Sequence, residues 1–214
     1  DVYKRQVYIY DLQQEMAGVP KIRLREERGT KVMIRYAEVL YPDLPESGEN
    51  VGKMMLENYR DATSTDMYIC SGEDGEIYQP KFTFHGYRYI EISGVKNPPK
   101  PEEVVSLQYS SVKQFDGEFE CSNTLLNRFA ENVFWSQKCN FINIPTDCPQ
   151  RNERMGWAGD THVFCHTALQ NSNLKLFYER NLQAMADLQT DHGRFPEIAP
   201  AGGGFGGITY ESAT

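Results

Sequence analysis

Apolar and polar residues alternate along much of the first half of the chain with the two-residue period of a β-strand. This alternation is clear over residues 31–39 and 81–92, and a shorter apolar run covers Val104–Ser110. The alternating apolar positions are Val32, Ile34 and Tyr36 in the first run and Phe82, Phe84, Ile90 and Ile92 in the second. Such runs are typical of half-buried antiparallel strands. We therefore expect β-structure from Val7 to about Ser111.

Turn residues separate these runs. Arg28-Gly29-Thr30 lies between residues 22–25 and 32–36, and Asp74-Gly75 before Ile77-Tyr78 is a two-residue hairpin signal. Residues 98–101, with three prolines, predict a rigid extended connector inside the β-rich half. Several short strands joined by turns, with no helical period, favour an antiparallel β-sandwich.

Aromatic residues are frequent in this half, at Phe82, Phe84, Tyr87 and Tyr89. Rings of this kind stack on sugars, so they could line a carbohydrate-binding face. Packing in the core and across strands is the simpler interpretation, because β-rich domains need such rings for stability. We interpret His85 in the same way, as a packed strand histidine.

The period changes to that of a helix near residues 115–122. Ser122 is a suitable N-cap, and the positions that follow predict a helix to about Asn140 with one apolar stripe. A second helix is expected from Asp160 or Thr161 to Gln170, and a third from Leu174 to Gln189. The stripe of the first helix consists of Leu125, Phe129 and Val133, with Leu126 and Ala130 beside it. The chain thus divides into a β-sandwich over residues 7–114 and a helical domain over residues 115–214.

The residues from Asp191 onwards predict a long loop, because prolines and the glycine-rich run 202–207 oppose regular structure. That run lacks the preceding strand and the following Lys-Ser/Thr of a phosphate-binding loop. His162, Cys165 and His166 have a helical spacing that could ligate zinc, but a fourth ligand or an open water position would be needed. We favour a buried cysteine and hydrogen-bonded histidines, and predict neither a metal nor a cofactor.

Composition narrows the possible partners. The chain has 214 residues, a formal net charge of −8 and a pI near 5.1, so nucleic acid and anionic membranes would be repelled. No apolar run approaches the length of a membrane span. The five cysteines include no CxxC pair, which argues against a disulfide framework and favours a reducing, cytoplasmic location over a periplasmic or secreted one.

The two ends of the sequence suggest a fragment. The chain begins without Met, and its opening DVYKRQ resembles a translated adapter tail, so we leave Asp1–Gln6 out of the fold prediction. It ends at GGGFGGITYESAT with no closing element.

Residues 146–160, TDCPQRNERMGWAGD, hold the densest cluster of chemically active side chains. The cluster comprises the carboxylates Asp147, Glu153 and Asp160, the arginines Arg151 and Arg154, and Trp157. A sugar-cleaving pocket needs carboxylates that bind hydroxyls and move protons, a cation that orients them, and a flat aromatic wall. The alternative is a solvated charged turn between two helices, since structural ion pairs are more frequent than active sites.

The sequence of this segment resembles the signature motif of bacterial α-L-rhamnosidases. Six further blocks resemble successive parts of the same family in the same order: YDLQQEMAGV, RYAEVL, ENYRDATSTDMY, FTFHGYRYIEI, GEFECSNTLLNRF and WSQKCNFINIP. The resemblance extends from Val7 to about Pro200. It implies a multi-domain protein in which a β-sandwich precedes an (α/α)6 barrel, of which this chain would hold only the first helices.

The resemblance also implies an activity, namely hydrolysis of terminal α-L-rhamnose with inversion of configuration. Glu153 matches the family's general acid. Asp147, Arg151 and Asp160 match residues that bind rhamnose hydroxyls, and Trp157 matches an aromatic wall of the sugar subsite. Asn152 stands where the family often has Asp, and we expect that change to alter local charge and not mechanism. The family's general base lies beyond Thr214, so the isolated chain is expected to be inactive.

The expected partner is therefore a rhamnose-containing glycoside or polysaccharide, with no nucleic acid and no membrane; no oligomeric state is predicted. Two alternatives stay open at this point. One is a non-catalytic carbohydrate-binding protein in which the sandwich binds sugar, and the other is an (α/α)6 hydrolase with another sugar specificity.

Overall fold

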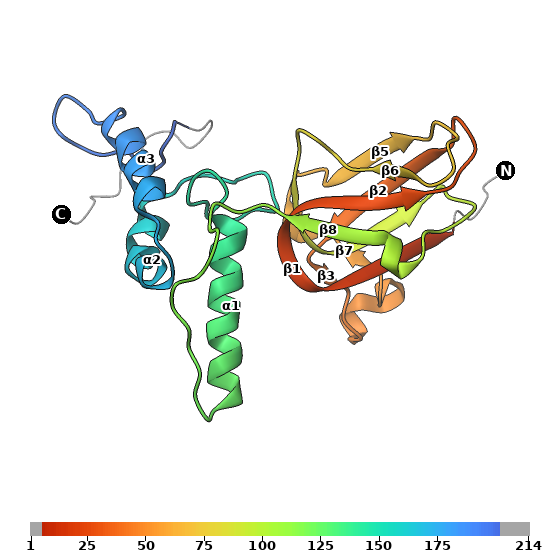
Figure 1. The fold of residues 1–214 in the computed structure, drawn as a ribbon, viewed down its shortest axis with the longest axis horizontal. Coiled ribbons are helices and arrows are strands. Elements are labelled where there is room, and N and C mark those ends of the chain that lie inside the picture. Colours follow the sequence, from red (N-terminus) through yellow and green to blue (C-terminus); the bar gives the residue numbers. More distant parts are fainter. Residues whose placement is uncertain (1–5, 202–214) are drawn as a thin grey trace. The chain divides into compact units, whose positions relative to one another are not determined.

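The computed structural model describes residues 6–201, and the chain divides into two compact units (Figure 1). The first, here called the sheet unit, comprises residues 1–108 together with Gln150–Asn152. The second, the helical unit, comprises Tyr109–Pro149 and the residues from Glu153 onwards. Three residues in the middle of the 146–160 motif thus belong to the sheet unit and not to the unit that surrounds them in sequence.

The sheet unit is built on a six-stranded antiparallel sheet with the order β5-β2-β7-β1-β6, in which β8 also pairs with β1. The strands are β1 (Val7–Leu24), β2 (Lys31–Ala37), β5 (Thr65–Ile69), β6 (Glu76–Tyr78), β7 (His85–Ser93) and β8 (Val104–Gln108). A separate two-stranded ribbon pairs β3 (Val39–Leu40) with β4 (Met54–Met55). Short 3-10 helices span Pro45–Asn50, Glu57–Tyr59 and Pro101–Glu103.

Strand β1 organises this sheet. It pairs with β7 over residues 7–18, with β8 over residues 18–22 and with β6 over residues 22–24. The register shifts between Asp11 and Met16, where Gln13 has a φ of 64°, and such a bulge bends a strand (Figure 1). At Gly18 an added Cβ would lie 2.1 Å from the Leu107 carbonyl oxygen, so only glycine allows β8 to approach.

The core of the sheet unit confirms most of the predicted strand faces. Val32, Ile34, Tyr36, Ile90 and Ile92 are fully buried. His85 is also buried: its ring stacks on Tyr36 with 3.9 Å between centroids, and its Nε2 lies 3.1 Å from Asp66 Oδ2. Tyr36 donates a hydrogen bond to the same Asp66 oxygen at 2.6 Å. The interpretation of His85 as a packed strand histidine is confirmed.

Two predictions for the sheet unit are wrong. Strand β7 begins at His85 and not at Lys81, so Phe82 precedes the strand and is fully exposed. The residues Asp74-Gly75 do form a turn, but they do not close a hairpin, because β6 pairs with β1 while β5 pairs with β2. In both cases pairing with strands distant in sequence decides the outcome.

The helical unit contains α1 (Thr124–Asn140), α2 (Ala158–Asn171) and α3 (Lys175–Ala186), within three residues of the predicted limits. The N-cap of α1 is Asn123 and not the predicted Ser122. The side-chain oxygen of Asn123 accepts hydrogen bonds from the amides of Leu125 at 2.9 Å and Leu126 at 3.4 Å. Helices α1 and α2 are joined through Gln137, which is buried and donates to the Ala168 carbonyl at 3.2 Å.

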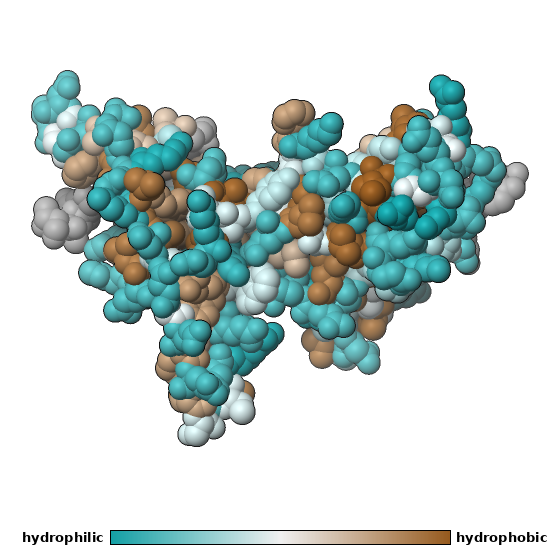
Figure 2. All heavy atoms as spheres, in the orientation of Figure 1, coloured by the Kyte–Doolittle hydropathy of each residue, from teal (hydrophilic) through white to brown (hydrophobic). Residues whose placement is uncertain are grey.

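Apolar side chains remain on the surface of all three helices (Figure 2). The predicted stripe of α1 is largely exposed, with Leu125 at 79% and Phe129 at 66%, as is Leu182 of α3 at 61%. The buried core of this unit is small and consists of Val112, Phe141, Ala168, Leu174 and Tyr178. Among residues 6–201, no helix is long and apolar enough to cross a membrane.

The predicted loop after Asp191 is confirmed as far as residue 201, where the chain forms neither helix nor strand apart from an isolated bridge at Ile198. The glycine-rich run 202–207 and the opening residues 1–5 lie outside the described residues.

Glu15 on β1 makes the stability of the sheet unit depend on pH. Burial raises the pKa of its carboxyl from 4.5 to about 8, the charge of Glu38 adds to this, and Arg88 opposes it. A carboxyl pKa that is raised on folding gives stability that is complete below the unfolded pKa and is lost as pH rises towards the folded value. Ionised Glu15 therefore destabilises the sheet in alkaline solution.

We predict that Glu15→Gln makes the chain more stable than the wild type at pH 9, by more than about 1 kcal/mol, with little difference at pH 4.5. Urea unfolding at several pH values measures this. Glu27→Gln is the control, since the Glu27 side chain is 80% exposed and forms an ion pair with Lys96. Equal pH profiles for wild type and Glu15→Gln would contradict the prediction.

Candidate active site

The 146–160 motif forms the loop between α1 and the start of α2, and its first residues are tied to the end of α1. The Thr146 amide and hydroxyl both donate to the Asn140 carbonyl oxygen, at 3.0 and 2.9 Å. Phe141 and Pro145 form an antiparallel bridge just before it. The helix end thereby fixes where the motif begins.

Asp147 and Met155 close the loop with two hydrogen bonds, one between backbone groups and one to the Asp147 side chain. The Asp147 amide donates to the Met155 carbonyl at 3.0 Å, and the Met155 amide donates to Asp147 Oδ1 at 2.9 Å. These two reciprocal hydrogen bonds hold Asp147 and Met155 together, although the two residues are eight positions apart in the sequence. Arg154, directly before Met155, has a φ of 52°, a left-handed conformation that is uncommon for residues other than glycine.

Glu153 lies beside Asp147 and is oriented by Trp157. The indole Nε1 of Trp157 donates to Glu153 Oε1 at 3.2 Å. Three atoms lie within 4.8 Å of one another here: a carboxylate oxygen of Asp147, a carboxylate oxygen of Glu153 and Sγ of Cys148. Because an indole N–H can only donate, Oε1 of Glu153 serves as an acceptor in this arrangement.

A segment distant in sequence supports the other side of the loop. The Ala158 amide donates to the Glu197 carbonyl at 2.7 Å, and the Ala199 amide donates to the Gly156 carbonyl at 3.0 Å. Trp157 and Ile198 form the bridge between these contacts. At Gly156 an added Cβ would lie 2.2 Å from the Ala199 carbonyl oxygen, so this position requires glycine.

A cleft of about 570 Å³ opens next to this cluster within the helical unit. It is lined by the last turn of α1, the start of the motif and the first turns of α2. Asp147 and Asp160 contribute to its lining, whereas Glu153 and Trp157 do not. Asp147 therefore belongs both to the cleft and to the group around Glu153.

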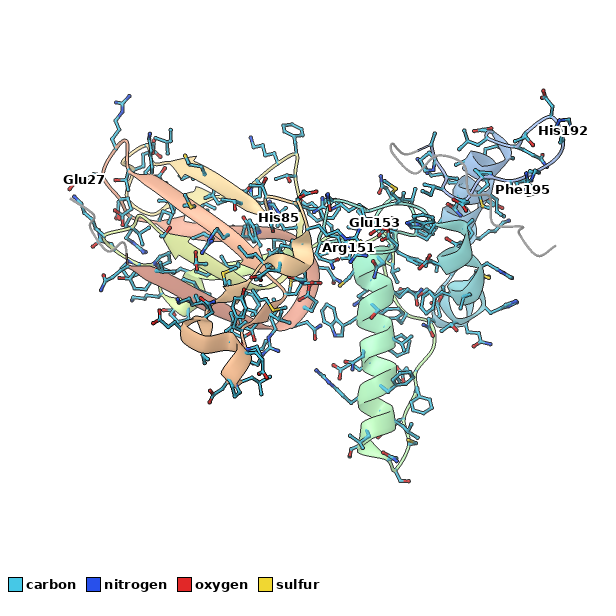
Figure 3. All side chains as sticks on the ribbon, turned by 180° about the vertical axis from the view of Figure 1, so that it is seen from behind. Glu27, His85, Arg151, Glu153, His192 and Phe195 are labelled. Atoms are coloured by element: carbon cyan, nitrogen blue, oxygen red, sulfur yellow. The ribbon has the colours of Figure 1, made fainter. Side chains whose placement is uncertain are left out.

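The structure brings the predicted site residues together in part. Glu153 is hydrogen-bonded to Trp157 and lies beside Asp147. Asp160 is exposed in the first turn of α2, where it lines the cleft. Arg151 belongs to the sheet unit, where its charge acts on the Glu38 carboxylate (Figure 3). Four of the five predicted residues thus belong to one unit and Arg151 to the other.

Sequence reasoning missed three contributors to this site. Cys148 is buried beside the two carboxylates, Met155 closes the loop, and residues 197–199 brace it. A possible signal for the last of these is the pair of prolines, Pro196 and Pro200, that brackets a short apolar stretch in an otherwise polar tail. Backbone contacts such as those of Met155 leave no sequence signal.

The geometry does not support the zinc hypothesis. Within residues 6–201, His162, Cys165 and His166 do not form a group with ligand atoms close enough to share an ion. Cys165 packs against the helical core, and its thiol donates to the His162 carbonyl at 3.2 Å. In the Asp147, Cys148 and Glu153 group, Asp147 Oδ1 and Glu153 Oε1 each accept a protein N–H, so we interpret that group as a hydrogen-bonding cluster.

Known protein families match both units. The concanavalin-like domain of bacterial α-L-rhamnosidases matches residues 2–110, and the six-hairpin glycosidase domain of the same proteins matches residues 114–213. An α-L-rhamnosidase of Formosa agariphila is 41% identical over 202 residues, which cover 93% of this chain and 21% of that protein. One of Streptomyces avermitilis is 38% identical over 200 residues, covering 94% of this chain and 19% of that protein.

Solved structures agree with these matches. The α-L-rhamnosidase from Dictyoglumus thermophilum has a TM-score of 0.83 at 37% identity, covering 92% of this chain and 22% of that one. The Streptomyces avermitilis enzyme in complex with L-rhamnose has a TM-score of 0.84 at 38% identity, covering 92% and 18%. The predicted order, a concanavalin-like β-domain and then helices of the barrel type, is confirmed. The chain spans about a fifth of the length of these relatives.

We predict that Gly156→Ala lowers the stability of the helical unit, by about 1–3 kcal/mol, because the new methyl group would force the Ala199 backbone away. Thermal unfolding followed by circular dichroism at 222 nm measures the change. Gly117→Ala is the matched control, since its added Cβ would meet only the Gln170 carbonyl oxygen, at 3.2 Å, and a smaller loss is expected. Equal losses for the two variants would show that the bracing segment does not constrain the loop.

Proposed function

The chain belongs to the bacterial α-L-rhamnosidases, and we propose that the protein containing it hydrolyses terminal α-L-rhamnose residues of glycosides or polysaccharides. The observation that carries this proposal is the arrangement of Glu153, held by the Trp157 N–H and placed beside Asp147 in a loop closed at both ends. The relatives named as α-L-rhamnosidases, one of them solved with L-rhamnose, support the choice of sugar.

Glu153 acts as the general acid in this proposal. The Trp157 N–H requires an acceptor, so a protonated Glu153 carries its proton on Oε2. That oxygen delivers the proton to the glycosidic oxygen as the bond to the sugar breaks. The indole thereby orients the acid, in addition to the role as an aromatic wall that we predicted from the sequence.

The other predicted residues bind the sugar. Asp147 and Asp160 line the cleft and accept hydrogen bonds from rhamnose hydroxyls. Arg151 donates hydrogen bonds to rhamnose hydroxyls. The Met155 amide holds the carboxylate of Asp147 in a fixed orientation, which favours recognition of one hydroxyl geometry over others.

The reaction inverts the anomeric configuration. Inverting glycosidases separate their two catalytic carboxyl groups by about 6.5–9.5 Å so that a water molecule fits between base and sugar. Asp147 is too close to Glu153 for this, since their ligand oxygens lie within 4.8 Å. We assign the base to another segment of the protein, and Asp147 to binding.

Glu153→Gln in the full-length protein is expected to lower kcat on an aryl α-L-rhamnoside with a poor leaving group by roughly 10²–10⁴-fold, the contribution of a positioned acid. Glu179→Gln on α3, an exposed residue paired with Lys175, is the control and should keep wild-type activity. Undiminished turnover of Glu153→Gln would refute the assignment. We propose that the isolated 214-residue chain shows no turnover, because we assign the base to another segment of the protein and the helices of this chain expose apolar side chains.

Proton NMR of the first product tests the stereochemistry. Inversion of an α-L-rhamnoside releases β-L-rhamnose, which then mutarotates to the equilibrium mixture. Appearance of α-L-rhamnose first would contradict the proposed mechanism. It would instead favour Asp147 as a nucleophile, because retaining enzymes hold their two carboxyl groups only about 5–5.5 Å apart.

A further inference from the structure

Gln150–Asn152 is the part of the motif that packs on the sheet unit. It contains Arg151 and ends directly before Glu153. The contacts that hold this segment include two places that are far apart in the sequence: strand β7, and Glu38 at the junction between β2 and β3. The 3-10 helix at Glu57–Tyr59 contacts Glu38 and Gly86 in turn. None of them belongs to the motif.

Strand β7 approaches the segment at Gly86. A Cβ added to Gly86 would lie 2.8 Å from Gln150 Cβ, 3.0 Å from its Cα and 3.1 Å from its backbone nitrogen. Real Cβ atoms essentially never show a contact as short as 2.8 Å, and the other two atoms are backbone that cannot swing away. Gln150 thus rests directly on the backbone of β7.

Gly86 itself is firmly held. It pairs with Ala17 of β1 in the central part of the sheet, and both residues are buried. Its carbonyl oxygen accepts a buried hydrogen bond from the Tyr59 hydroxyl at 2.8 Å. A position fixed by strand pairing and by a buried tyrosine is a rigid support for the segment above it.

Glu38 supplies the polar part of the contact. Its carboxylate accepts hydrogen bonds from the side chains of Gln150 and Asn58, and the positive charge of Arg151 acts on it. Burial nevertheless raises the pKa of Glu38, so the carboxylate is half-enclosed and these partners offset the cost of desolvation. Glu38 therefore interacts with two successive residues of the segment. This fixes both the face that the segment turns towards the sheet unit and the direction in which the segment runs.

We propose that Gly86 and Glu38 are positioning residues that hold Gln150–Asn152 on the sheet unit and thereby set the place of Arg151 for sugar binding. The purpose of this contact rests on the proposed function, in which Arg151 binds rhamnose hydroxyls.

The first experiment measures the contact without any activity. Hydrogen–deuterium exchange of Gly86→Ala and Glu38→Ala in the full-length protein should show faster exchange, by roughly tenfold or more, in peptides that cover residues 150–152. Exchange in the remainder of β1 and β7 should be unchanged. Glu91→Gln is the control, since Glu91 also lies on β7 but pairs with Arg35 and not with the segment. Unaltered exchange at residues 150–152 in both variants would overturn the proposal.

The second experiment measures the effect on sugar binding. Both variants should raise KM for an aryl α-L-rhamnoside, and Kd for L-rhamnose by calorimetry, roughly tenfold, the equivalent of one lost hydrogen bond to the ligand. The change in kcat should be smaller than that in KM, in contrast to Glu153→Gln. Glu38→Ala keeps the proposal testable if Gly86→Ala does not fold, because it leaves the backbone contact in place.

A double-mutant cycle separates positioning from general destabilisation. If Gly86 acts through Arg151, Gly86→Ala should weaken rhamnose binding no further in an Arg151→Ala background. Additive losses would overturn the positioning role. A wild-type protein that binds no rhamnose would refute the proposed function instead, while the exchange measurements would still decide whether the contact exists.

Discussion

The motif that carries the chemistry is placed by two contacts in which one backbone touches another with no room for a side chain. At Gly86 the strand β7 meets Gln150, and at Gly156 the loop meets Ala199. Contacts of this kind leave little freedom, since the neighbouring backbones are themselves paired in a sheet or a bridge. Within the helical unit, the orientation of Glu153 by Trp157 and of Asp147 by Met155 depends on a loop that the contact between Gly156 and Ala199 holds.

Much of the fold follows from local patterns, and the exceptions follow from pairing between distant segments. Alternation located the buried faces of β2 and β7, and helical spacing located three helices. The length of β1 was not predictable, because the bulge near Gln13 breaks the alternation and the same strand then serves three partners. The Asp74-Gly75 turn has the composition of a hairpin, yet its flanking strands pair elsewhere. Turn chemistry determines a local bend and not the partner of a strand.

In the candidate site, too, local sequence patterns predict some features, while contacts between distant segments determine the others. Residue types indicated three carboxylates, two arginines and Trp157, because sugar chemistry uses such groups. The family resemblance then selected Arg151 over Arg154 and implied the role of each residue. The sequence could not show that three residues of one motif belong to a different unit from their neighbours. It also could not show that residues 197–199 brace the loop, since a backbone amide and carbonyl are present at nearly every position and leave no mark on composition.

Each of the two carboxylates at the centre of the candidate site receives a hydrogen bond from a different kind of donor, and the roles that we propose for them rest on this difference. Asp147 accepts a backbone amide that is part of the loop's own closure, so its orientation cannot change without opening the loop. A group fixed in this way is suited to recognising a hydroxyl. Glu153 accepts from an indole side chain, which leaves its backbone position independent of that bond. The same bond requires Oε1 to remain an acceptor and so directs a proton to Oε2. Under the proposed function, a fixed acceptor beside an oriented acid forms the binding and proton-donating half of the site, and the short separation of the two carboxylates is the reason for assigning the water-activating group to another segment.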